Sequence, residues 1–404
     1  MSLEPQLVVV GAGPGGYVAA FKAADLGMRV TLVDAAVNPG GVCLYRGCIP
    51  SKALLHVAKV LNESKAAANW GISFPPPTID IDKLRSWKDE VIGKMTGGLG
   101  QLVKTRKIDY IQGHGTFLGN NELRIKSDGD GGKDLRFEHA ILATGSVPAT
   151  IPTFDIGSDR IIDSTSALEL SEVPETMLVV GGGYIGLELG SAYAALGTRV
   201  SVVEMTDGLI PPADRDLIKP LARRLDREFE QIMLKTKVLA VRDKDNFLQV
   251  EFQGADSTFN GDYHKVLVAV GRQPNSARIG LDQTSVQLDQ KGFVQVDAQR
   301  RTAAPSIFAI GDIAGEPMLA HKAFYEASVA VEAIAGHDVA YEPNAIPAVV
   351  FTDPEIAWCG LTEKEAAEQQ RDVEVARFPW AASGRATTLG SNDGLTKLVV
   401  DPKT

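Results

Sequence analysis

The 404-residue sequence has few cysteines, no long hydrophobic run and no cluster of basic residues. Three cysteines in so long a chain exclude the disulfide framework of a small secreted protein. The longest apolar stretches, such as 7–10 and 266–270, are far shorter than the roughly 20 residues that cross a bilayer. The net charge of -10 offers no footprint for nucleic acid or an anionic membrane. Because residues 1–6 also lack the basic start of a signal peptide, we expect a cytoplasmic protein with no membrane span and no nucleic-acid partner.

One sequence pattern occurs twice, 170 residues apart. Each copy has an apolar run, a G-x-G-x-x-G motif, an alanine-rich stretch that ends in glycine, a second apolar run and a terminal acid. This order predicts a strand, a tight turn, a helix and a second strand. The matching residues are Gly11, Gly13, Gly16, Gly27, Val30 and Asp34 in the first copy, and Gly181, Gly183, Gly186, Gly197, Val200 and Glu204 in the second.

Both copies have the features of a dinucleotide-binding fold. The three glycines allow a tight turn, close approach of a pyrophosphate and close packing of helix on strand, and the helix N-terminus attracts the phosphates. The acid, 23 residues after the first glycine, lies where it can accept hydrogen bonds from a ribose. A bare motif can be only a glycine-rich turn, but here each copy has its strand, helix and acid. The sequence therefore predicts two bound dinucleotides.

The second site is expected to prefer NAD(H) over NADP(H). Glu204 is followed by Met205, Thr206 and Asp207, none of which is a cation that could bind a 2′-phosphate.

Two cysteines, Cys43 and Cys48, lie close together in the segment GGVCLYRGCIPSK at 40–52. A structural disulfide across so short a loop constrains the unfolded chain comparatively little. Two thiolates are half of a tetrahedral zinc site, and His56 and Cys359 are the only soft ligands with a claim to complete it. From these residues alone, core thiols, a redox pair and metal ligands all remain open. We expect Cys359, which has no partner in the sequence, to be a buried small hydrophobic residue.

The segment around the cysteines resembles the redox-active disulfide of the pyridine nucleotide-disulfide oxidoreductases, which also follows an N-terminal G-x-G-x-x-G. The resemblance covers nearly the whole chain. The segment PMLAHKA is similar to the branch of the family that acts on lipoyl groups. The further segments that carry the resemblance are ATGSVP at 143–148, VGRQPN at 270–275, IFAIGD at 307–312, PMLAHKA at 317–323 and IPAVVFTDPE at 346–355.

The resemblance implies FAD in the first nucleotide fold, NAD in the second and a disulfide between Cys43 and Cys48. Cys43 would exchange with a dithiol substrate, and Cys48 would lie beside the flavin. Lys52 would lie near flavin N5 with Glu188 as its partner, although a solvated lysine and a first-turn acid are the ordinary alternatives. No metal is implied. The other implied cofactor-binding residues are Gly41, Thr144, Gly145, Gly271, Gly311, Asp312 at the ribityl chain, Ala320, and His321 near the flavin pyrimidine.

The implied activity is the oxidation of dihydrolipoamide, carried on a lipoyl domain, with NAD as electron acceptor. The resemblance further implies a homodimer that serves a 2-oxoacid dehydrogenase or a glycine cleavage complex. Two alternatives stay open: another disulfide reductase of the family, of mercuric or glutathione type, and a flavin-binding assembly subunit without turnover.

The expected fold class is α/β, with two Rossmann-like domains and a C-terminal α+β interface domain. The boundaries are 1–148 plus 275–341 for the FAD domain, 149–274 for the NAD domain and 342–404 for the interface domain. We expect the last domain to be incomplete, because 395–404 reads as a lone strand running into a turn. The family's His–Glu acid–base pair would follow this point, so such a chain should accept electrons from NADH yet turn over dithiols poorly.

Overall fold

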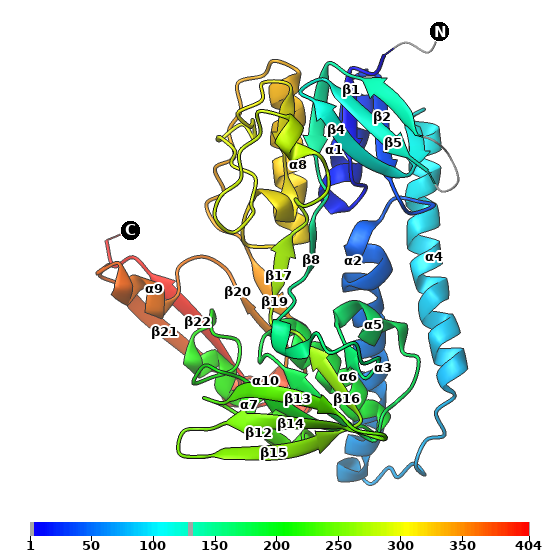
Figure 1. Cartoon of the computed structure of the whole chain (residues 1–404). Coiled ribbons are helices and arrows are strands. Elements are labelled where there is room, and N and C mark those ends of the chain that lie inside the picture. Colours follow the sequence, from blue (N-terminus) through cyan, green and yellow to red (C-terminus); the bar gives the residue numbers. More distant parts are fainter. Residues whose placement is uncertain (1–3, 128–131, 404) are drawn as a thin grey trace. The chain divides into compact units, whose positions relative to one another are not determined.

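The computed structural model describes residues 4–127 and 132–403, which form two compact units (Figure 1). The first unit comprises the described residues of Met1–Pro50, Arg85–Ala149 and Arg272–Pro343, and the second those of Ser51–Leu84, Thr150–Gly271 and Asn344–Thr404. Each unit contains a five-stranded parallel sheet, which confirms the predicted α/β class. The three predicted domain boundaries stay a prediction.

The parallel sheet of the first unit has the strand order β18-β7-β1-β2-β3. Its central strand β1 is fully apolar and buried because both faces of the sheet are covered. Helices α1 and α8 pack on one face, and the antiparallel sheet β4-β5-β6 packs on the other. The elements are β1 (Leu7–Val10), α1 (Pro14–Asp25), β2 (Val30–Asp34), α2 (Gly41–Arg46), β3 (Asp109–Gln112), β4 (His114–Gly119), β5 (Glu122–Lys126), β6 (Lys133–Arg136), β7 (His139–Leu142), β8 (Ser146–Pro148), β17 (Arg272–Pro274), η3 (Leu281–Gln283), β18 (Ile307–Ala309), η4 (Gly311–Ala314) and α8 (Ala320–Ile334).

The parallel sheet of the second unit has the order β12-β11-β10-β16-β9. Helices α5, α6 and α7 contribute to the core on one face, and the antiparallel sheet β13-β14-β15 packs on the other. The elements are η1 (Ala67–Trp70), η2 (Pro152–Phe154), β9 (Ile161–Ile162), α5 (Ser164–Glu169), β10 (Thr176–Val180), α6 (Tyr184–Leu196), β11 (Arg199–Val203), α7 (Arg215–Glu228), β12 (Gln231–Met233), β13 (Lys237–Asp243), β14 (Leu248–Gln253), β15 (Thr258–Tyr263), β16 (Lys265–Val268), β19 (Ala348–Val350), β20 (Ile356–Trp358), α9 (Glu363–Glu368), β21 (Glu374–Pro379), η5 (Trp380–Ala382), α10 (Gly384–Thr388) and β22 (Leu395–Val400). The boundary between the units falls within α3 (Cys48–Ala66) and α4 (Ile81–Thr105).

The two copies of the repeated pattern fold as predicted, into β1-α1-β2 and β10-α6-β11. Each helix ends just before the glycine that closes the pattern. Gly27 and Gly197 have φ angles of 86° and 116°, which residues with a Cβ rarely adopt. The helix ends are therefore set by local sequence.

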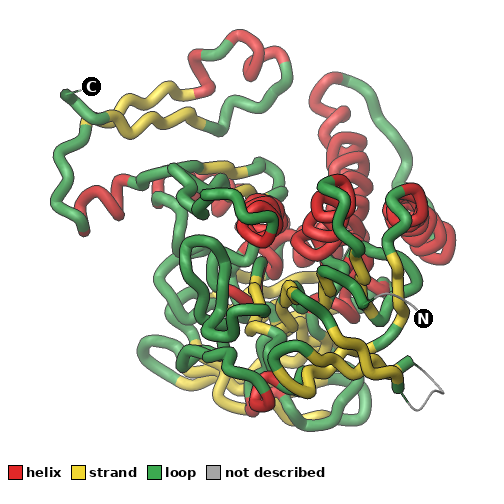
Figure 2. Tube along the Cα trace, turned by 90° about the horizontal axis from the view of Figure 1, so that it is seen from above, coloured by secondary structure: helices red, strands yellow, loops and turns green. Residues whose placement is uncertain are grey.

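The last strand has a partner, so the expectation of a lone terminal strand is wrong. β22 pairs antiparallel with β21, from Glu374 opposite Val400 to Pro379 opposite Leu395. Figure 2 shows these strands running side by side close to the C-terminus. Trp380 reinforces the pairing, since its indole N–H donates to Thr396 Oγ1 at 3.0 Å.

A buried lysine of this hairpin holds it to the rest of the second unit. Lys397 is only 4% exposed, and its Nζ lies 2.7 Å from a carboxylate oxygen of each of Asp214, Asp216 and Glu363. These are the only described carboxylates, thiols or imidazoles grouped closely enough to hold a metal ion. The lysine ammonium already lies among them and offsets part of their negative charge.

The expectation that Cys359 is buried is also wrong, since its side chain is exposed. The residue follows the last residue of the short strand β20 and precedes Gly360, whose φ of 78° turns the chain. Its position in a turn outweighs the usual preference of a free thiol for the core. Among the described residues, no helix combines the length and the apolar character needed to cross a membrane.

Candidate nucleotide-binding and redox sites

The first glycine motif packs backbone against backbone. Gly11 has a φ of 99°, and a Cβ on it would lie 2.3 Å from the Ala143 carbonyl oxygen. A Cβ on Gly16 would lie 1.8 Å from the Gly11 oxygen, and one on Gly41 would lie 2.4 Å from the Cα of Gly13. Only glycine fits these positions. The turn therefore delivers the uncapped N-terminus of α1, with its free N–H groups, as an anion-binding surface.

Asp34 lies beside this turn, at the end of β2. Its Oδ2 accepts a hydrogen bond from the Ala12 N–H at 2.6 Å, and its Oδ1 accepts one from the Ala36 N–H at 2.9 Å. A carboxylate has about four acceptor positions, so capacity remains for the two hydroxyls of a ribose. These residues fit the adenosine half of a dinucleotide.

The second glycine motif repeats the same construction. Gly181 has a φ of 110°, and a Cβ on it would lie 2.5 Å from the Ala269 carbonyl oxygen. A Cβ on Gly186 would lie 2.4 Å from the Gly181 oxygen, whereas one on Gly183 would meet no described atom within 4 Å. The loop is thus tight where it supports the helix and open at the helix start, where a pyrophosphate would approach.

Glu204 occupies the position of Asp34 in this second copy. Its two oxygens accept the N–H groups of Gly182 at 2.7 Å and Thr206 at 2.8 Å. The fold also brings in a residue that the sequence analysis missed: the backbone N–H of Lys235 donates to the Thr206 oxygen at 2.9 Å. No pattern close to Glu204 in the sequence identifies this neighbour.

The two cysteines lie at a break between helices. Cys43 is half-buried in α2, Gly47 interrupts the helix, and exposed Cys48 begins α3. A thiolate at the start of a helix is stabilised by the free N–H groups and the helix dipole. Tyr17 of α1 lies near both sulfurs: burial and the negative charges of Cys43 and Cys48 raise its pKa to about 12.

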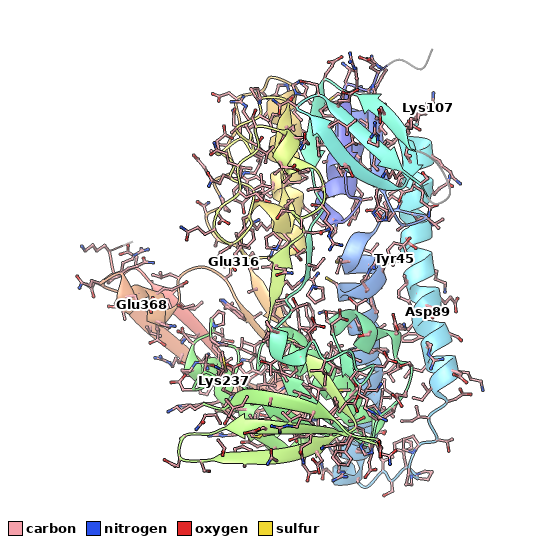
Figure 3. All side chains as sticks on the ribbon, viewed as in Figure 1. Tyr45, Asp89, Lys107, Lys237, Glu316 and Glu368 are labelled. Carbon is pink, nitrogen blue, oxygen red and sulfur yellow. The ribbon has the colours of Figure 1, made fainter. Side chains whose placement is uncertain are left out.

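Tyr45 and Arg46, which precede Gly47 between the two cysteines, differ in their surroundings. The hydroxyl of Tyr45, labelled in Figure 3, donates to the Asn38 carbonyl oxygen at 3.0 Å and so ties α2 to the loop after β2. Arg46 is exposed to solvent.

Lys52 and Glu188 come together in the second unit. Lys52 Nζ lies 2.7 Å from Oε2 of Glu188, which is only 3% exposed. The second oxygen of Glu188 accepts the Phe351 N–H at 2.9 Å, and the Lys52 ammonium lies 4.5 Å from the centre of the Phe351 ring. Phe351 was missed as a site residue because only the fold brings it to α3 and α6. The three residues hold a positive charge in a defined place beside the second nucleotide fold.

Asp312 is held by a chain of hydrogen bonds in the first unit. Its Oδ2 accepts the Ser146 hydroxyl at 2.5 Å, and Ser146 Oγ accepts from Arg272 Nε at 2.7 Å. Ser146 is buried, so the Asp312 carboxylate has a restrained orientation. Neighbouring strands β8 and β17 pair antiparallel and place Ser146 and Arg272 together.

The remaining predicted residues lie on the segments around Asp312 and at the connection between the nucleotide folds. The Thr144 hydroxyl donates to the Asn275 oxygen at 2.9 Å, and Asn275 N–H donates to the Gly145 oxygen at 2.9 Å. Ala320 and the exposed His321 are the first residues of α8. Gly271, with a φ of 124°, precedes β17 in sequence but belongs to the second unit.

Comparison with known proteins places this chain in a family. The model of the pyridine nucleotide-disulphide oxidoreductases matches residues 5–327, and the model of that family's dimerisation domain matches 346–404. The chain therefore belongs to the pyridine nucleotide-disulphide oxidoreductases.

Two curated relatives are named dihydrolipoyl dehydrogenase. The one from Vibrio parahaemolyticus is 47% identical, and the match covers 100% of this chain and 84% of the relative. The one from Geobacillus stearothermophilus is 44% identical, over 99% of this chain and 84% of the relative.

Solved structures with the same fold include two bacterial proteins. The HOCl-induced flavoprotein disulfide reductase RclA from Escherichia coli is 27% identical with a TM-score of 0.86, over 98% of this chain and 87% of that one. LpdA from Mycobacterium tuberculosis has a TM-score of 0.89 at 23% identity, over 97% of this chain and 86% of that one, and supports the fold alone.

Proposed function

We propose that this chain is a flavoprotein disulfide oxidoreductase that oxidises dihydrolipoamide to lipoamide and reduces NAD, using FAD and a Cys43–Cys48 disulfide. The observation that carries the proposal is identity of 47% over the whole chain to an enzyme named for this reaction, in a chain that has both nucleotide motifs and the cysteine pair. FAD, when bound, supplies the two-electron chemistry that links a dithiol to a pyridine nucleotide.

The geometry of the glycine motifs supports an assignment of residues to the two cofactors. The first motif with Asp34 and Asp312 would hold FAD, and the second motif with Glu204 would hold NAD(H). Gly41, Thr144, Gly145, Gly271, Ala320 and His321 complete the proposed cofactor-binding set. The backbone packing at the glycines supports this assignment, because it leaves the helix N-termini accessible to phosphates.

The cysteines perform dithiol–disulfide exchange. One substrate thiolate attacks the Cys43 sulfur, the sulfur–sulfur bond to Cys48 breaks, and Cys48 leaves as a thiolate stabilised by the start of α3. The second substrate thiolate then attacks its own partner sulfur in the mixed disulfide. Cys43 leaves as a thiolate and the cyclic lipoyl disulfide forms, so two electrons reach the cysteine pair and two protons are released.

Lys52 and Glu188 position charge for the reaction rather than exchanging electrons. The buried Glu188 carboxylate orients Lys52 through an ion pair of 2.7 Å and also holds the main chain at Phe351. A fixed ammonium favours negative charge that develops close to it, and it does so without reorganisation when the charge appears.

The partner in the cell is a lipoyl group on a carrier domain of a 2-oxoacid dehydrogenase or glycine cleavage complex, and the working form is a cytoplasmic homodimer. The match of residues 346–404 to a dimerisation domain supports the dimer. The dithiol chemistry of Cys43 and Cys48 supports the lipoyl substrate.

The test separates electron entry from substrate turnover. Anaerobic titration with NADH is followed by flavin absorbance and by counting thiols. NAD reduction is then measured with dihydrolipoamide as electron donor, and NADH oxidation is measured separately with glutathione disulfide and with Hg²⁺ as electron acceptors. We expect NADH to reduce bound flavin and generate two thiols, and we expect NAD reduction with dihydrolipoamide alone. Flavin reduction without new thiols, or preference for another substrate, would contradict the proposal.

Cys43→Ser and Cys48→Ser are matched variants for this test, since both keep the nucleotide motifs intact. Each variant should still bind FAD, and titration with NADH should no longer generate two thiols. Dihydrolipoamide oxidation by either variant at the wild-type rate would exclude the disulfide mechanism.

A further inference from the structure

A buried charged network lies behind the turn that carries Asp312, and the proposed reaction does not use it. Glu326 of α8 is 0% exposed, and Lys322, one turn earlier on the same helix, is 5% exposed. Glu326 Oε1 lies 2.9 Å from Arg300 Nη1 and 3.0 Å from Lys322 Nζ. One negative and two positive charges are therefore concentrated in a largely apolar interior.

The network holds both polar groups of the Gly311 backbone. The Gly311 N–H donates to Glu326 Oε2 at 2.6 Å, and the Gly311 carbonyl oxygen accepts from Lys322 Nζ at 3.2 Å. Lys322 Nζ also donates to the Gly315 carbonyl oxygen at 3.0 Å. The turn from Gly311 to Gly315 is thus restrained near both ends by two side chains of α8 that lie four residues apart on one face.

Asp312 lies inside this restrained turn. Its main chain follows Gly311, while its carboxylate is held independently by Ser146 at 2.5 Å. Gly311 has a φ of 76°, which glycine adopts readily, so the chain turns sharply after β18 and the contacts of this turn set where Asp312 lies. The direction of the Asp312 carboxylate consequently depends on one contact to its side chain and on several to the backbone before and after it.

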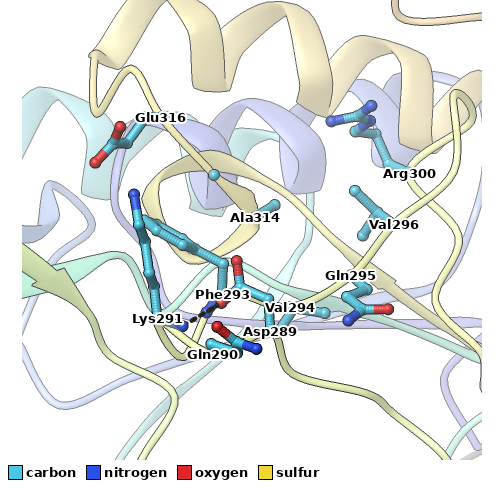
Figure 4. Close-up of a pocket in the computed structure, with 11 residues that line it drawn as sticks. Asp289, Gln290, Lys291, Phe293, Val294, Gln295, Val296, Arg300, Ala314 and Glu316 are labelled. Carbon is cyan, nitrogen blue, oxygen red and sulfur yellow. Dashed lines mark hydrogen bonds between the residues drawn. The ribbon is translucent and has the colours of Figure 1, made fainter.

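Stability alone does not account for the network. Taking charges out of water is costly, and apolar residues of similar volume often replace a buried ion network without loss of stability. Arg300 is the member that reaches the outside, where it lines a pocket of about 820 Å³ with Glu316 and Lys291 (Figure 4). Lys322 contacts the turn and Glu326, and Glu326 contacts the turn, Lys322 and Arg300, so the two residues of α8 share the turn as a partner.

We propose that Lys322 and Glu326 are positioning residues for the flavin: they fix the Gly311–Gly315 main chain so that Asp312 presents its carboxylate to FAD in one orientation. This inference deepens the proposed function and rests on it, since it takes Asp312 as an FAD ligand. Lys322 and Glu326 themselves act only through the turn.

The test is FAD affinity, measured by titrating the full-length apoprotein with FAD and following flavin fluorescence. Glu326→Gln removes the charge that accepts the Gly311 N–H, and loss of a charge-assisted hydrogen bond corresponds to about 10- to 100-fold weaker FAD binding. Glu332→Gln is the matched control, because Glu332 lies on the same helix in a partly exposed pair with Lys22 at 2.7 Å. We expect the control to bind FAD like the wild type.

A double-mutant cycle with Asp312→Ala separates positioning from general stabilisation. If Glu326 acts through Asp312, the double variant binds FAD no more weakly than Asp312→Ala alone. Two results would overturn the inference and leave the proposed function intact. The first is that the losses of FAD affinity in the two single variants add up in the double variant. The second is that Glu326→Gln binds FAD like the wild type while Asp312→Ala binds it more weakly. Wild-type affinity in Asp312→Ala would remove Asp312 as a flavin ligand and overturn the inference, while NADH titration and dihydrolipoamide turnover test the proposed function separately.

A second variant keeps the test decisive if Glu326→Gln does not fold. Lys322→Gln retains an amide donor near the Gly311 carbonyl oxygen but loses the ammonium, and it enters the same cycle with Asp312→Ala. We expect weaker FAD binding and a changed visible circular dichroism of the bound flavin. Unchanged affinity and spectrum in this variant would contradict the role of Lys322.

Discussion

Replacing Lys397 with methionine is expected to release the β21–β22 hairpin from its attachment to the N-terminus of α7 and to α9. The substitution keeps an unbranched side chain of similar length in the buried position and removes only the ammonium. Asp214, Asp216 and Glu363 would then lose the cation that each contacts at 2.7 Å. Three neighbouring carboxylates without that charge repel one another.

The magnitude follows from the burial of the four groups. Breaking a buried ion pair costs about 3–5 kcal/mol, because the remaining charge is left without compensation. Here Asp214 is 8% exposed, while Asp216 and Glu363 are 24% and 33% exposed and remain close to Arg377. Water and Arg377 can therefore compensate part of the loss, and we expect about 2–3 kcal/mol less local stability.

Amide hydrogen exchange of β21 and β22 is the appropriate assay, because two units need not unfold in one step. The expected loss corresponds to about 30- to 150-fold faster exchange in these strands, with little change in β1 or β10. Lys403→Met, at an exposed position, is the control. Exchange within about threefold of the wild type, or equal acceleration throughout both units, would refute the reasoning.

Acidification should remove the difference in amide exchange rate of β21 and β22 between Lys397→Met and the wild type. Burial raises the pKa of Asp214 and Asp216, but hydrogen bonds from Lys397 and its neighbours outweigh it and leave both pKa values lowered. The hydrogen bond from Lys397 lowers the pKa of Glu363. Depressed carboxyl pKa values stabilise the folded state above roughly pH 4 and lose this effect as the pH falls through the folded values. Exchange rates that stay different in acid would contradict this origin.

Three further outcomes are expected. Phe351→Leu keeps the main-chain bond to Glu188 but removes the ring beside Lys52, so stopped-flow reduction by NADH should slow about two- to fivefold, with Phe351→Tyr near the wild type. Tyr17→Phe should leave the pH profile of turnover unchanged between about pH 6 and 9, because the raised pKa of about 12 keeps Tyr17 neutral; a displaced profile would be inconsistent with this. Glu204→Gln should lower the preference for NADH over NADPH about tenfold in kcat/KM, since a repelling charge is lost, and an unchanged ratio would exclude this role of Glu204.

The nucleotide folds could be predicted because their determinants are close together in the sequence. Gly11, Gly13 and Gly16 act within a single turn, and the strand, helix and acid around them follow at regular spacing. The fold that these residues predict therefore does not depend on contacts with distant segments. The α/β class follows from the same local pattern, which occurs twice.

The contacts between distant segments could not be predicted in this way. Phe351 reaches Glu188 across 163 residues, and Lys397 reaches Asp216 across 181. No spacing rule links such residues. Lys322 and Glu326 are an intermediate case, because their separation of four residues predicts a shared helix face but not that the face is buried against Gly311.

The contact between Gly13 and Gly41 brings the cysteine segment against the nucleotide turn with no side chain between them. A Cβ on Gly41 would lie only 2.4 Å from the Cα of Gly13, so the two main chains themselves form the contact. The spacing from the start of α2 to the first glycine turn is consequently independent of any rotamer. The backbone contact itself sets how closely the cysteine segment approaches the glycine turn.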